Sequence, residues 1–468
     1  MTTWTLRQII EATGGQLVRG QPDMSVRDIS IDSRRLSPGE AFVAIHGKRL
    51  DGHHFLEDAA HHGAACLIVS RIPASTNGAG SLPMVLVRDT TEALGDLARY
   101  HRRRLGVPVI SITGSCGKTT TKELIAHLVG TPGTVLKTTG TQNNQIGVPL
   151  TLLRLTPQHQ IAVVELGSNH PGEIGYLASI AEPDVTVITN VGPVHLEFFE
   201  SLIGVLREKI SLLDAVSPTG CAVLPGDQLD VCLEASQHLL PTVRLVTFGT
   251  SERCDIQAMD VQRAAEGMCL RLRDHLGQWA VPLVGYHNVE NVLAALACAW
   301  AMGVPLSVAK ERRASLETVP LRSQVVRCNG LTILIDCSNA NPLSFARALE
   351  TLRDSEVRRK LAIVGDILEL EEYAASAHQA IGRMAVQLGI DAVLAVGEYA
   401  NDVVQGVREA NSDKVTMYRT VQELIHELPS ILQAGDGLLV KGSRRLNLEQ
   451  VTDFLIQYYQ GPHRDPAR

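Results

Sequence analysis

The sequence lacks the features that mark membrane and nucleic-acid-binding proteins. No apolar run reaches the roughly 18 residues that a spanning helix needs. Basic residues are not in excess. The chain has 43 lysines and arginines and 50 aspartates and glutamates, which gives a net charge of −7. No positive field therefore attracts the chain to nucleic acid or to an anionic membrane. The first ten residues lack a basic segment followed by an apolar core, so they predict an amphipathic helix and not a signal peptide.

Paired cysteine motifs are also missing. The nine cysteines are odd in number and scattered, and no Cys-x-x-Cys occurs. Neither a zinc ribbon nor a disulfide framework is indicated by this pattern. We therefore expect a protein of the reducing cytoplasm, in which most of these thiols are small buried side chains.

Length and composition predict a globular protein of several domains. At about 150 residues per domain, 468 residues correspond to roughly three domains. The chain is 45% apolar and 20% charged, which is close to the globular average. We place the domains at residues 1–98, 99–315 and 316–468.

Strand and helix patterns predict an α/β fold in all three segments. In the first segment, short strands at 29–33, 41–45 and 64–70 precede a helix at 89–105, with a loop at 72–81. Beyond residue 107, apolar strands alternate with helices, which is typical of parallel βαβ units. The expected strands are 107–113, 161–165, 185–190 and 221–224, and the expected helices are 119–129, 173–181 and 201–216.

The same alternation restarts after residue 316 and predicts a second, smaller, Rossmann-like doubly wound sheet. Its expected strands are 331–335, 361–364, 392–396 and 437–440, and its expected helices are 344–354, 378–388, 421–432 and 448–458. We expect the tail at 461–468 to be frayed.

A phosphate-binding loop is predicted at residues 113–120, which read TGSCGKTT between a strand and a helix. Gly114 and Gly117 allow the backbone to curl, so that its N–H groups face an anion at the helix N-terminus. Lys118 can reach the β- and γ-phosphates, and the Thr119 hydroxyl can bind Mg²⁺. The strict pattern G-x-x-x-x-G-K-[ST] fails, because Ile112 stands at its first glycine. The alternative interpretation is a glycine-rich turn with an exposed lysine.

Two candidate metal ligands follow on later strands. Glu165 ends one predicted strand, and His195 lies just beyond the next. Both are expected at the edge of the sheet where the carboxyl ends of parallel strands meet. A carboxylate is a natural ligand for Mg²⁺. On the residues alone, a loop histidine is more often structural than a ligand.

Five short motifs occur in a fixed order along the chain. They are TGSCGKTTTK at 113–122, ELG at 165–167, NVGPVH at 190–195, GYHNVEN at 285–291 and KGSR at 441–444. In order and spacing they resemble the Mur ligases, the ATP-dependent amide ligases of peptidoglycan precursor synthesis. Residues 32–39, 42–45 and 51–53 resemble the UDP-sugar-binding domain of the branch that uses D-alanyl-D-alanine. Residues 143–144, 147–149 and 365–370 resemble the same branch.

The resemblance implies a ligase that uses ATP to activate a carboxylate as an acyl phosphate. The implied substrates are the small molecules UDP-N-acetylmuramoyl-tripeptide and D-alanyl-D-alanine. Two Mg²⁺ sites are implied, one at Thr119 and Glu165 and one at His195 and a carbamylated Lys209. The implied catalytic residues are Lys118, His195 and Lys209. We expect a monomer that binds no nucleic acid, and the alternative for Lys209 is a solvated helical lysine.

The resemblance also implies contacts to nucleotide and substrate from all three domains. The expected nucleotide contacts are Gly114, Ser115, Cys116, Gly117, Lys118, Thr119, Thr120, Asn190, His287, Asn288, Asn291, Arg322 and Asp336. The expected substrate contacts are Ser33, Arg34, Asn143, Asn144, Asn339, Asn341, Lys441 and Arg444. Arg322 and Asp336 would reach ATP when the domains close, and closure would exclude water from the acyl phosphate. For Ser33 and Arg34, a strand-end cap and a surface arginine are the alternatives.

Four segments depart from the family pattern. Residues 335–342 read IDCSNANP, 320–322 read PLR where the family has PGR, 225–227 read PGD, and 140–144 read GTQNN. An amide ligase of the same family with a different donor or acceptor therefore remains an alternative. A non-catalytic homologue that binds nucleotide or UDP-sugar is a third hypothesis, which the retained Lys118, Thr119, Glu165, His195 and Lys209 disfavour. The acidic charge disfavours a fourth, an ATPase stimulated by nucleic acid.

Overall fold

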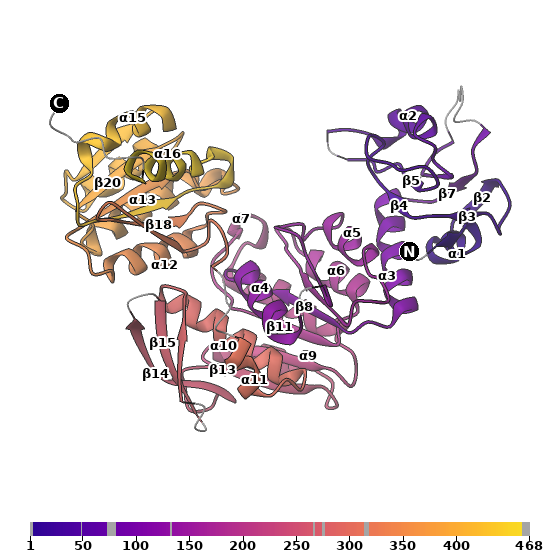
Figure 1. Cartoon of the computed structure of the whole chain (residues 1–468), viewed down its shortest axis with the longest axis horizontal. Helices are drawn as coiled ribbons and strands as arrows, with labels where there is room; N and C mark the ends of the chain where they lie inside the picture. The colour runs from indigo at the N-terminus through magenta and orange to yellow at the C-terminus, as the bar shows by residue number, and fades with distance from the viewer. Residues whose placement is uncertain are drawn as a thin grey trace.

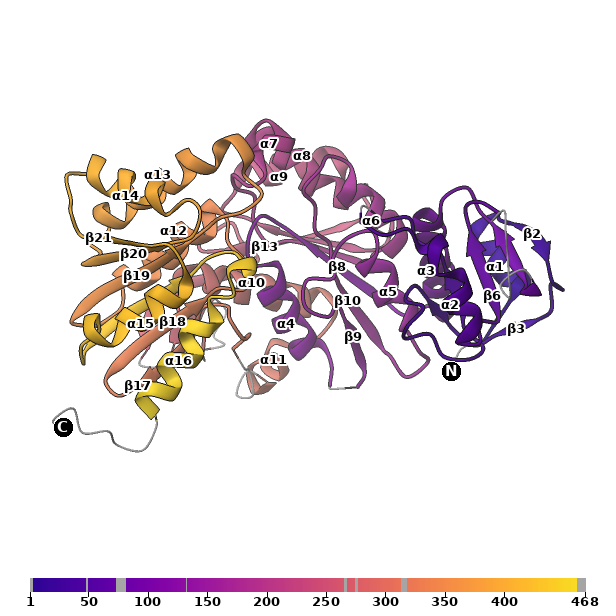
Figure 2. The same ribbon diagram turned by 90° about the horizontal axis from the view of Figure 1, so that it is seen from above.

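The computed structural model contains three large β-sheets, one in each third of the chain (Figure 1). It describes residues 3–47, 49–72, 81–131, 133–264, 267–273, 277–312 and 318–460. The units built on the first and last sheets lie at opposite ends of the unit built on the middle sheet, in both views (Figures 1 and 2). The middle unit therefore lies between the two others.

The N-terminal unit is a five-stranded mixed sheet flanked by short helices. The strand order is β2 (Gln16–Arg19), β7 (Met84–Leu86), β6 (Cys66–Val69), β5 (Ala41–Val43), β4 (Ile29–Ser30), with only β2 antiparallel to its neighbour. Helix α1 (Leu6–Thr13) begins with a capping box between Thr5 and Gln8, so the helix expected over the first ten residues is present but starts only at Leu6. Strands β1 (Trp4–Thr5) and β3 (Ser25–Val26) pair beside it, and helix α2 (Leu56–His61) covers the other face.

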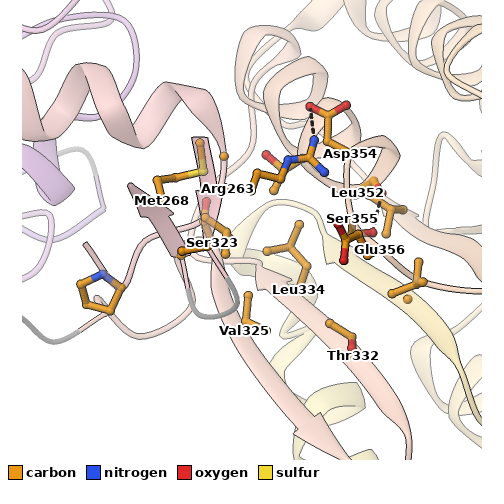
Figure 3. A pocket seen from close by; sticks show the side chains of 18 of the residues that line it. Arg263, Met268, Ser323, Val325, Thr332, Leu334, Leu352, Asp354, Ser355 and Glu356 are labelled. Atoms are coloured by element: carbon orange, nitrogen blue, oxygen red, sulfur yellow. Dashed lines mark hydrogen bonds and ion pairs between the residues drawn. The ribbon is translucent and has the colours of Figure 1, made fainter. Parts of the chain in front are cut away.

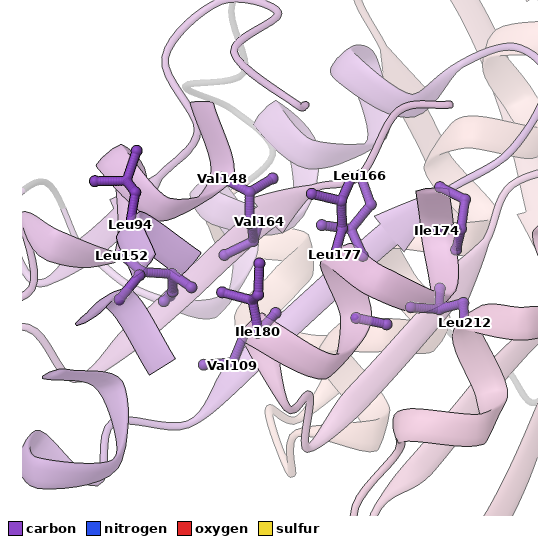
Figure 4. Close-up of a cluster of buried hydrophobic side chains, with 14 of the residues drawn as sticks. Leu94, Val109, Val148, Leu152, Val164, Leu166, Ile174, Leu177, Ile180 and Leu212 are labelled. Atoms are coloured by element: carbon purple, nitrogen blue, oxygen red, sulfur yellow. The ribbon is translucent and has the colours of Figure 1, made fainter. Parts of the chain in front are cut away.

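Helix α3 (Thr90–Leu105) joins the N-terminal unit to the middle unit. Asp89 caps its N-terminus, and Gly106 ends it in the left-handed conformation. Its buried side chains share one hydrophobic cluster with both units, and Figure 4 shows Leu94 beside Leu152, Val164 and Ile180 of the middle unit. Each such leucine contributes roughly 2 kcal/mol by its burial. A continuous core therefore connects the two units.

The middle unit has a nine-stranded sheet that is parallel except at one edge. The order is β16 (Gln278–Val281), β15 (Gly267–Leu272), β14 (Ile256–Ala264), β13 (Arg244–Gly249), β12 (Cys221–Pro225), β11 (Val185–Ile188), β8 (Val109–Thr113), β10 (Ile161–Glu165), β9 (Val135–Lys137). Only β14, β15 and β16 pair in antiparallel fashion.

Helices cover both faces of the middle sheet, as the βαβ pattern predicts. Helices α4 (Lys118–Val129) and α10 (Tyr286–Ala301) cover one face, with α11 (Leu306–Arg312) beside them. Helices α3, α5 (Gly147–Leu153), α6 (Glu173–Ala181), α8 (Leu202–Ile210) and α9 (Leu229–His238) cover the other. The carboxyl ends of β8, β10 and β11 thus meet at one edge, which carries the candidate site.

The C-terminal unit is a doubly wound sheet, as predicted, but it has six strands where four were expected, because β17 (Gln324–Cys328) and β21 (Val415–Tyr418) were missed. The order is β17, β18 (Leu331–Asp336), β22 (Asp436–Lys441), β19 (Arg359–Gly365), β20 (Ala392–Val396), β21, with only β17 antiparallel. One face is covered by α12 (Pro342–Arg353), α13 (Ala374–Gln387) and α14 (Ala400–Glu409), and the other by α15 (Val421–Ile431) and α16 (Glu449–Gln460).

Some sequence predictions need correction. The helix expected at 201–216 is wrong as one element, because α8 ends at Ile210 and a 3-10 helix follows over Ser211–Ala215. The antiparallel strands β14 to β16, the short β2, β7 and β9, and α10 were not predicted. The tail at 461–468 and most of the loop at 72–81 lie outside the described residues. In the described part of the chain, no helix is long and apolar enough to cross a membrane. All nine cysteines are unpaired thiols.

Candidate active site

The predicted phosphate loop lies between β8 and α4. Gly114 and Gly117 have φ values of +145° and +82°, which disfavour any residue with a side chain. A Cβ atom on Gly114 would lie 2.0 Å from Thr189 Oγ1, and one on Gly117 would lie 2.1 Å from Asn291 Oδ1. Both glycines are therefore required by conformation and by close packing. Helix α4 begins at Lys118 directly after them, so its free N–H groups face the loop.

Polar side chains from the end of β11 hold the loop in place. Asn190 Oδ1 accepts a hydrogen bond from the Cys116 N–H (3.0 Å), and Asn190 Nδ2 donates to the Cys116 carbonyl (3.1 Å). Thr189 Oγ1 donates to the same carbonyl (2.6 Å), and Ser115 bonds the backbone of Gly192 at 2.9 Å. Asn190, expected as a nucleotide contact, thus braces the loop backbone. Thr189 was missed, although it directly precedes the motif that begins at Asn190.

Lys118 is positioned at the mouth of the loop. Its Nζ donates to the Gly114 carbonyl (2.6 Å), so the side chain folds back over the loop. Burial lowers the pKa of the Lys118 ammonium, and the Glu165 carboxylate acts in the opposite direction. Thr119 and Thr120 follow in the first turn of α4 and are buried. An anion that entered the loop would meet the helix N-terminus and this cation together.

Glu165 presents an unused oxygen beside this loop. Its side chain is 1% exposed at the end of β10, and its Oε1 accepts a hydrogen bond from Asn143 Nδ2 (2.9 Å). Its Oε2 is buried and has no hydrogen-bond partner among the described residues, and the Lys122 ammonium is 4.0 Å away. A buried carboxylate oxygen left free in this way is a suitable ligand for a hard divalent cation. The free oxygen of Glu165 thus fits a Mg²⁺ ligand at the edge of the sheet where Thr119 lies in the first turn of α4.

The surroundings of His195 and Lys209 favour the neutral form of each side chain. Burial, with smaller effects of Lys118 and Lys209, lowers the pKa of His195 to about 4. Burial, followed by the charge of Lys118, lowers the pKa of Lys209 to about 7. Lys209 is 1% exposed, and its Nζ donates to Ser168 Oγ (2.7 Å) and lies 5.5 Å from the centre of the Phe199 ring. The described residues contain no cluster of three or more His, Cys, Asp or Glu side chains that could hold a metal ion.

The predicted residues of α10 connect the phosphate loop to the C-terminal unit. Asn291 Nδ2 donates to Asn288 Oδ1 (2.9 Å), and both side chains are buried behind the loop. His287 Nε2 lies 3.1 Å from Ser323 Oγ of the C-terminal unit, and burial lowers the pKa of His287 to about 4. This contact shows that the two units meet beside the start of α10.

Asp336 and Lys441 form a buried ion pair at the carboxyl ends of β18 and β22. Lys441 Nζ lies 2.6 Å from Asp336 Oδ2 and donates to the Asn339 carbonyl (3.3 Å). Asn341 caps α12 through the Ser344 N–H (2.7 Å). The neighbouring carboxyl ends of β18 and β22 thus bring these polar groups together.

The C-terminal unit also contacts the phosphate loop and carries a strained backbone. Cys116 Sγ donates to Asn341 Oδ1 (3.5 Å) across the boundary between the units.

Arg322 is half-buried between Leu321 and Ser323, which have φ values of +62° and +45°. Leu321 stands where the family pattern has glycine, so the left-handed conformation costs about 1 kcal/mol here.

The remaining predicted substrate residues are spread over the chain. Ser33 is buried in the N-terminal unit, while Arg34 is exposed and pairs with Asp32 (2.9 Å). Asn144 Oδ1 accepts the Gly147 N–H (3.0 Å) at the start of α5. Arg444 is exposed and pairs with Glu449 (3.1 Å). In the described part of the chain, none of these side chains has a hydrogen bond or ion pair to the phosphate loop.

A cavity of about 750 Å³ lies between the β14–β15 edge and the C-terminal unit (Figure 3). Gly285, Tyr286 and Ser323 line it, and an ion pair between Arg263 and Asp354 (3.1 Å) spans its two sides. None of the described residues that line this cavity belongs to the phosphate loop. The cavity therefore adjoins the start of α10 and not the predicted phosphate site.

Three family models match the chain, and together they span most of it. They are "Mur ligase family, catalytic domain" at residues 25–102, "Mur ligase middle domain" at 112–299 and "Mur ligase, glutamate ligase domain" at 321–444.

Named relatives match over nearly their whole length. The chain is 35% identical to the UDP-N-acetylmuramoyl-tripeptide–D-alanyl-D-alanine ligase of Escherichia coli (strain K12), over 96% of this chain and 98% of that protein. It is 31% identical to the enzyme of the same name in Bacillus subtilis (strain 168), over 97% and 98%. A crystal structure of MurF from Acinetobacter baumannii is similar with a TM-score of 0.88 and 31% identity, covering 98% of this chain and 99% of that one. MurF ligase from Thermotoga maritima in complex with ADP gives a TM-score of 0.82 at 28% identity, covering 93% and 98%.

Proposed function

Because the chain belongs to the Mur ligase family, we propose that it joins D-alanyl-D-alanine to UDP-N-acetylmuramoyl-tripeptide at the expense of ATP. The product would be the pentapeptide precursor of peptidoglycan, with ADP and phosphate. The observation that carries the ligase chemistry is the phosphate loop beside the free oxygen of Glu165. The choice of substrates is supported by the full-length relatives that bear this name and by their solved structures.

The reaction needs activation because a carboxylate is a poor electrophile with a poor leaving group. In the proposed reaction, a carboxylate oxygen of the tripeptide attacks the γ-phosphorus of ATP, and ADP leaves. The amine of D-alanyl-D-alanine then attacks the acyl phosphate carbonyl, phosphate leaves, and the nitrogen loses a proton. The first step brings two anions together, and Lys118 reduces their repulsion from its position over the loop.

Two Mg²⁺ ions are part of the proposal. Thr119 and Glu165 would hold one ion, and its fit rests on the unpartnered Oε2 of Glu165. His195 and Lys209 would hold the second, with Lys209 as a carbamate. Carbon dioxide adds only to a neutral amine, and burial gives Lys209 a pKa at which the neutral form is populated. Bound Mg²⁺ would neutralise charge on the transferring phosphoryl group.

Each unit of the chain has a distinct role in this proposal. Residues 1–98 would bind the UDP moiety through Ser33 and Arg34, and residues 99–315 would bind ATP. Residues 316–468 would bind the incoming dipeptide and complete the nucleotide site. The C-terminal residues that we assign to these contacts are Arg322, Asp336, Asn339, Asn341, Lys441 and Arg444. The enzyme would act as a monomer in the cytoplasm.

Phosphate release tests the proposed substrates. We expect release only when ATP, UDP-N-acetylmuramoyl-tripeptide and D-alanyl-D-alanine are all present. Lys118→Ala should reduce this release at least about a hundredfold, with an unchanged circular dichroism spectrum. Release with another amine in place of D-alanyl-D-alanine would instead support a family member with a different acceptor. That alternative is suggested by the departures at 335–342.

A further inference from the structure

Lys122 is a fully buried lysine on α4, one turn after Lys118, and the proposed reaction does not use it. We propose that Lys122 is a positioning residue that fixes the Glu165 carboxylate with one oxygen free for a divalent cation. This inference rests on the proposed function, because it concerns how the chain prepares the Mg²⁺ site.

The ammonium of Lys122 is fully occupied by acceptors other than Glu165. Its Nζ donates to the carbonyls of Thr138 (2.8 Å) and Gly140 (3.2 Å) and pairs with Glu123 Oε1 (3.0 Å). A lysine ammonium has three N–H groups, so none is left for Glu165. Glu165 Oε2 lies 4.0 Å away, beyond hydrogen-bond distance. Lys122 therefore attracts the carboxylate without occupying the oxygen that a cation needs.

The same contacts hold the segment that fixes the other side of Glu165. Thr138, whose carbonyl accepts from Lys122, also accepts the Glu165 N–H through its Oγ1 (3.0 Å). The chain then continues through Gly140 to Asn143, which donates to Glu165 Oε1 (2.9 Å). Lys122 thus anchors both the backbone and the occupied oxygen of Glu165.

A lysine that served only the fold would have the same burial, so the test must separate stability from cation binding. Lys122→Met shortens the side chain by one atom and removes its charge and its N–H donors. Glu123→Ala leaves Lys122 in place but frees one N–H, which Glu165 Oε2 can then accept. Glu123 is partly exposed, so this variant opens no hole in the core. Lys137→Met is the matched control, because Lys137 pairs with Glu123 from the surface and does not touch the loop carbonyls.

The experiment is calorimetric titration of the full chain with a non-hydrolysable ATP analogue at a series of Mg²⁺ concentrations and in EDTA. Mg²⁺ is expected to increase the affinity for the analogue. We expect Lys122→Met and Glu123→Ala to need at least about tenfold more Mg²⁺ than wild type to reach half of this increase, as for other residues that orient a metal ligand. Their affinity in EDTA and the behaviour of Lys137→Met should match wild type.

Two results would overturn the inference. One is a wild-type Mg²⁺ requirement in both variants; if Lys122→Met fails to fold, Glu123→Ala alone decides. The other is an equal loss of affinity with and without Mg²⁺, which would mean that Lys122 supports the loop and not the cation site. If the wild-type chain bound the analogue equally well with and without Mg²⁺, that result would instead refute the proposed function itself.

Discussion

The lowered pKa of Lys209 makes a quantitative prediction about its reaction with carbon dioxide. At pH 7.5, a lysine with a pKa of 10.5 is neutral in about one molecule in a thousand, whereas a pKa of about 7 leaves roughly three quarters neutral. At fixed carbon dioxide pressure, the reactive form of Lys209 is therefore several hundred times more abundant than that of a surface lysine. The fraction that can react should rise as pH increases through 7, and not near 10.

Carbon-13 NMR of the enzyme under ¹³C-labelled carbon dioxide measures this directly. At pH 7.5 we expect wild type and Lys137→Met to show a carbamate resonance that is missing from Lys209→Met; any carbamate of the α-amino group, whose pKa is near 8, should be the same in all three. The resonance should decrease as pH falls below 7 at constant carbon dioxide pressure. Identical carbamate spectra of wild type and Lys209→Met at pH 8 would refute the reasoning.

Three other perturbations test the site and its electrostatics. Gly117→Ala should abolish ADP binding in calorimetry, because its Cβ would lie 2.1 Å from Asn291 Oδ1. Gly106→Ala is the control, because Gly106 also has a positive φ but has open space around it. This variant should lose only about 1 kcal/mol of folding stability. Normal ADP affinity in Gly117→Ala would be inconsistent with the described loop. Asn190→Ala removes two hydrogen bonds to the phosphate loop, worth about 2 kcal/mol, so ADP should bind roughly thirtyfold more weakly. A loss of affinity below about threefold would count against Asn190 as a brace of the loop. The pKa of His195 is about 4 in the folded chain and about 6.5 in the unfolded chain, so the unfolded chain binds a proton more readily. The histidine should therefore lower the folding stability progressively as pH falls from 6.5 to 4. His195→Gln should flatten that part of a plot of melting temperature against pH. An unchanged profile in His195→Gln would show that the folded chain does not disfavour the protonated form of this histidine.

The strands and the phosphate loop could be predicted because their signals are local. Residues 161–165 and 173–181 have uninterrupted apolar or amphipathic patterns, and the structure has a strand and a helix at these bounds. The loop at 113–120 was predicted from glycines and Lys-Thr between a strand and a helix, although Ile112 breaks the strict motif. The antiparallel strands β14 to β16 were missed because their exposed faces interrupt the apolar runs.

The polar contacts around the site could not be predicted, because they join residues far apart in the sequence. Thr138 and Glu165 are linked only because β9 and β10 pair, and nothing local marks Thr138 as a partner of Lys122. Ser168 likewise meets Lys209 across 41 positions of the chain. The sequence could indicate that Glu165 lies at the ligand edge of the sheet, but not that one of its oxygens lacks a partner.

Transfer of oxygen from the substrate carboxylate tests the proposed ligase reaction most directly. UDP-N-acetylmuramoyl-tripeptide labelled with ¹⁸O in its terminal carboxylate would be incubated with ATP, D-alanyl-D-alanine and the enzyme. We predict one ¹⁸O atom in each phosphate released, because the acyl phosphate leaves with an oxygen of the acid. Unlabelled phosphate, with pentapeptide still formed, would contradict activation of the carboxylate by the terminal phosphoryl group of ATP.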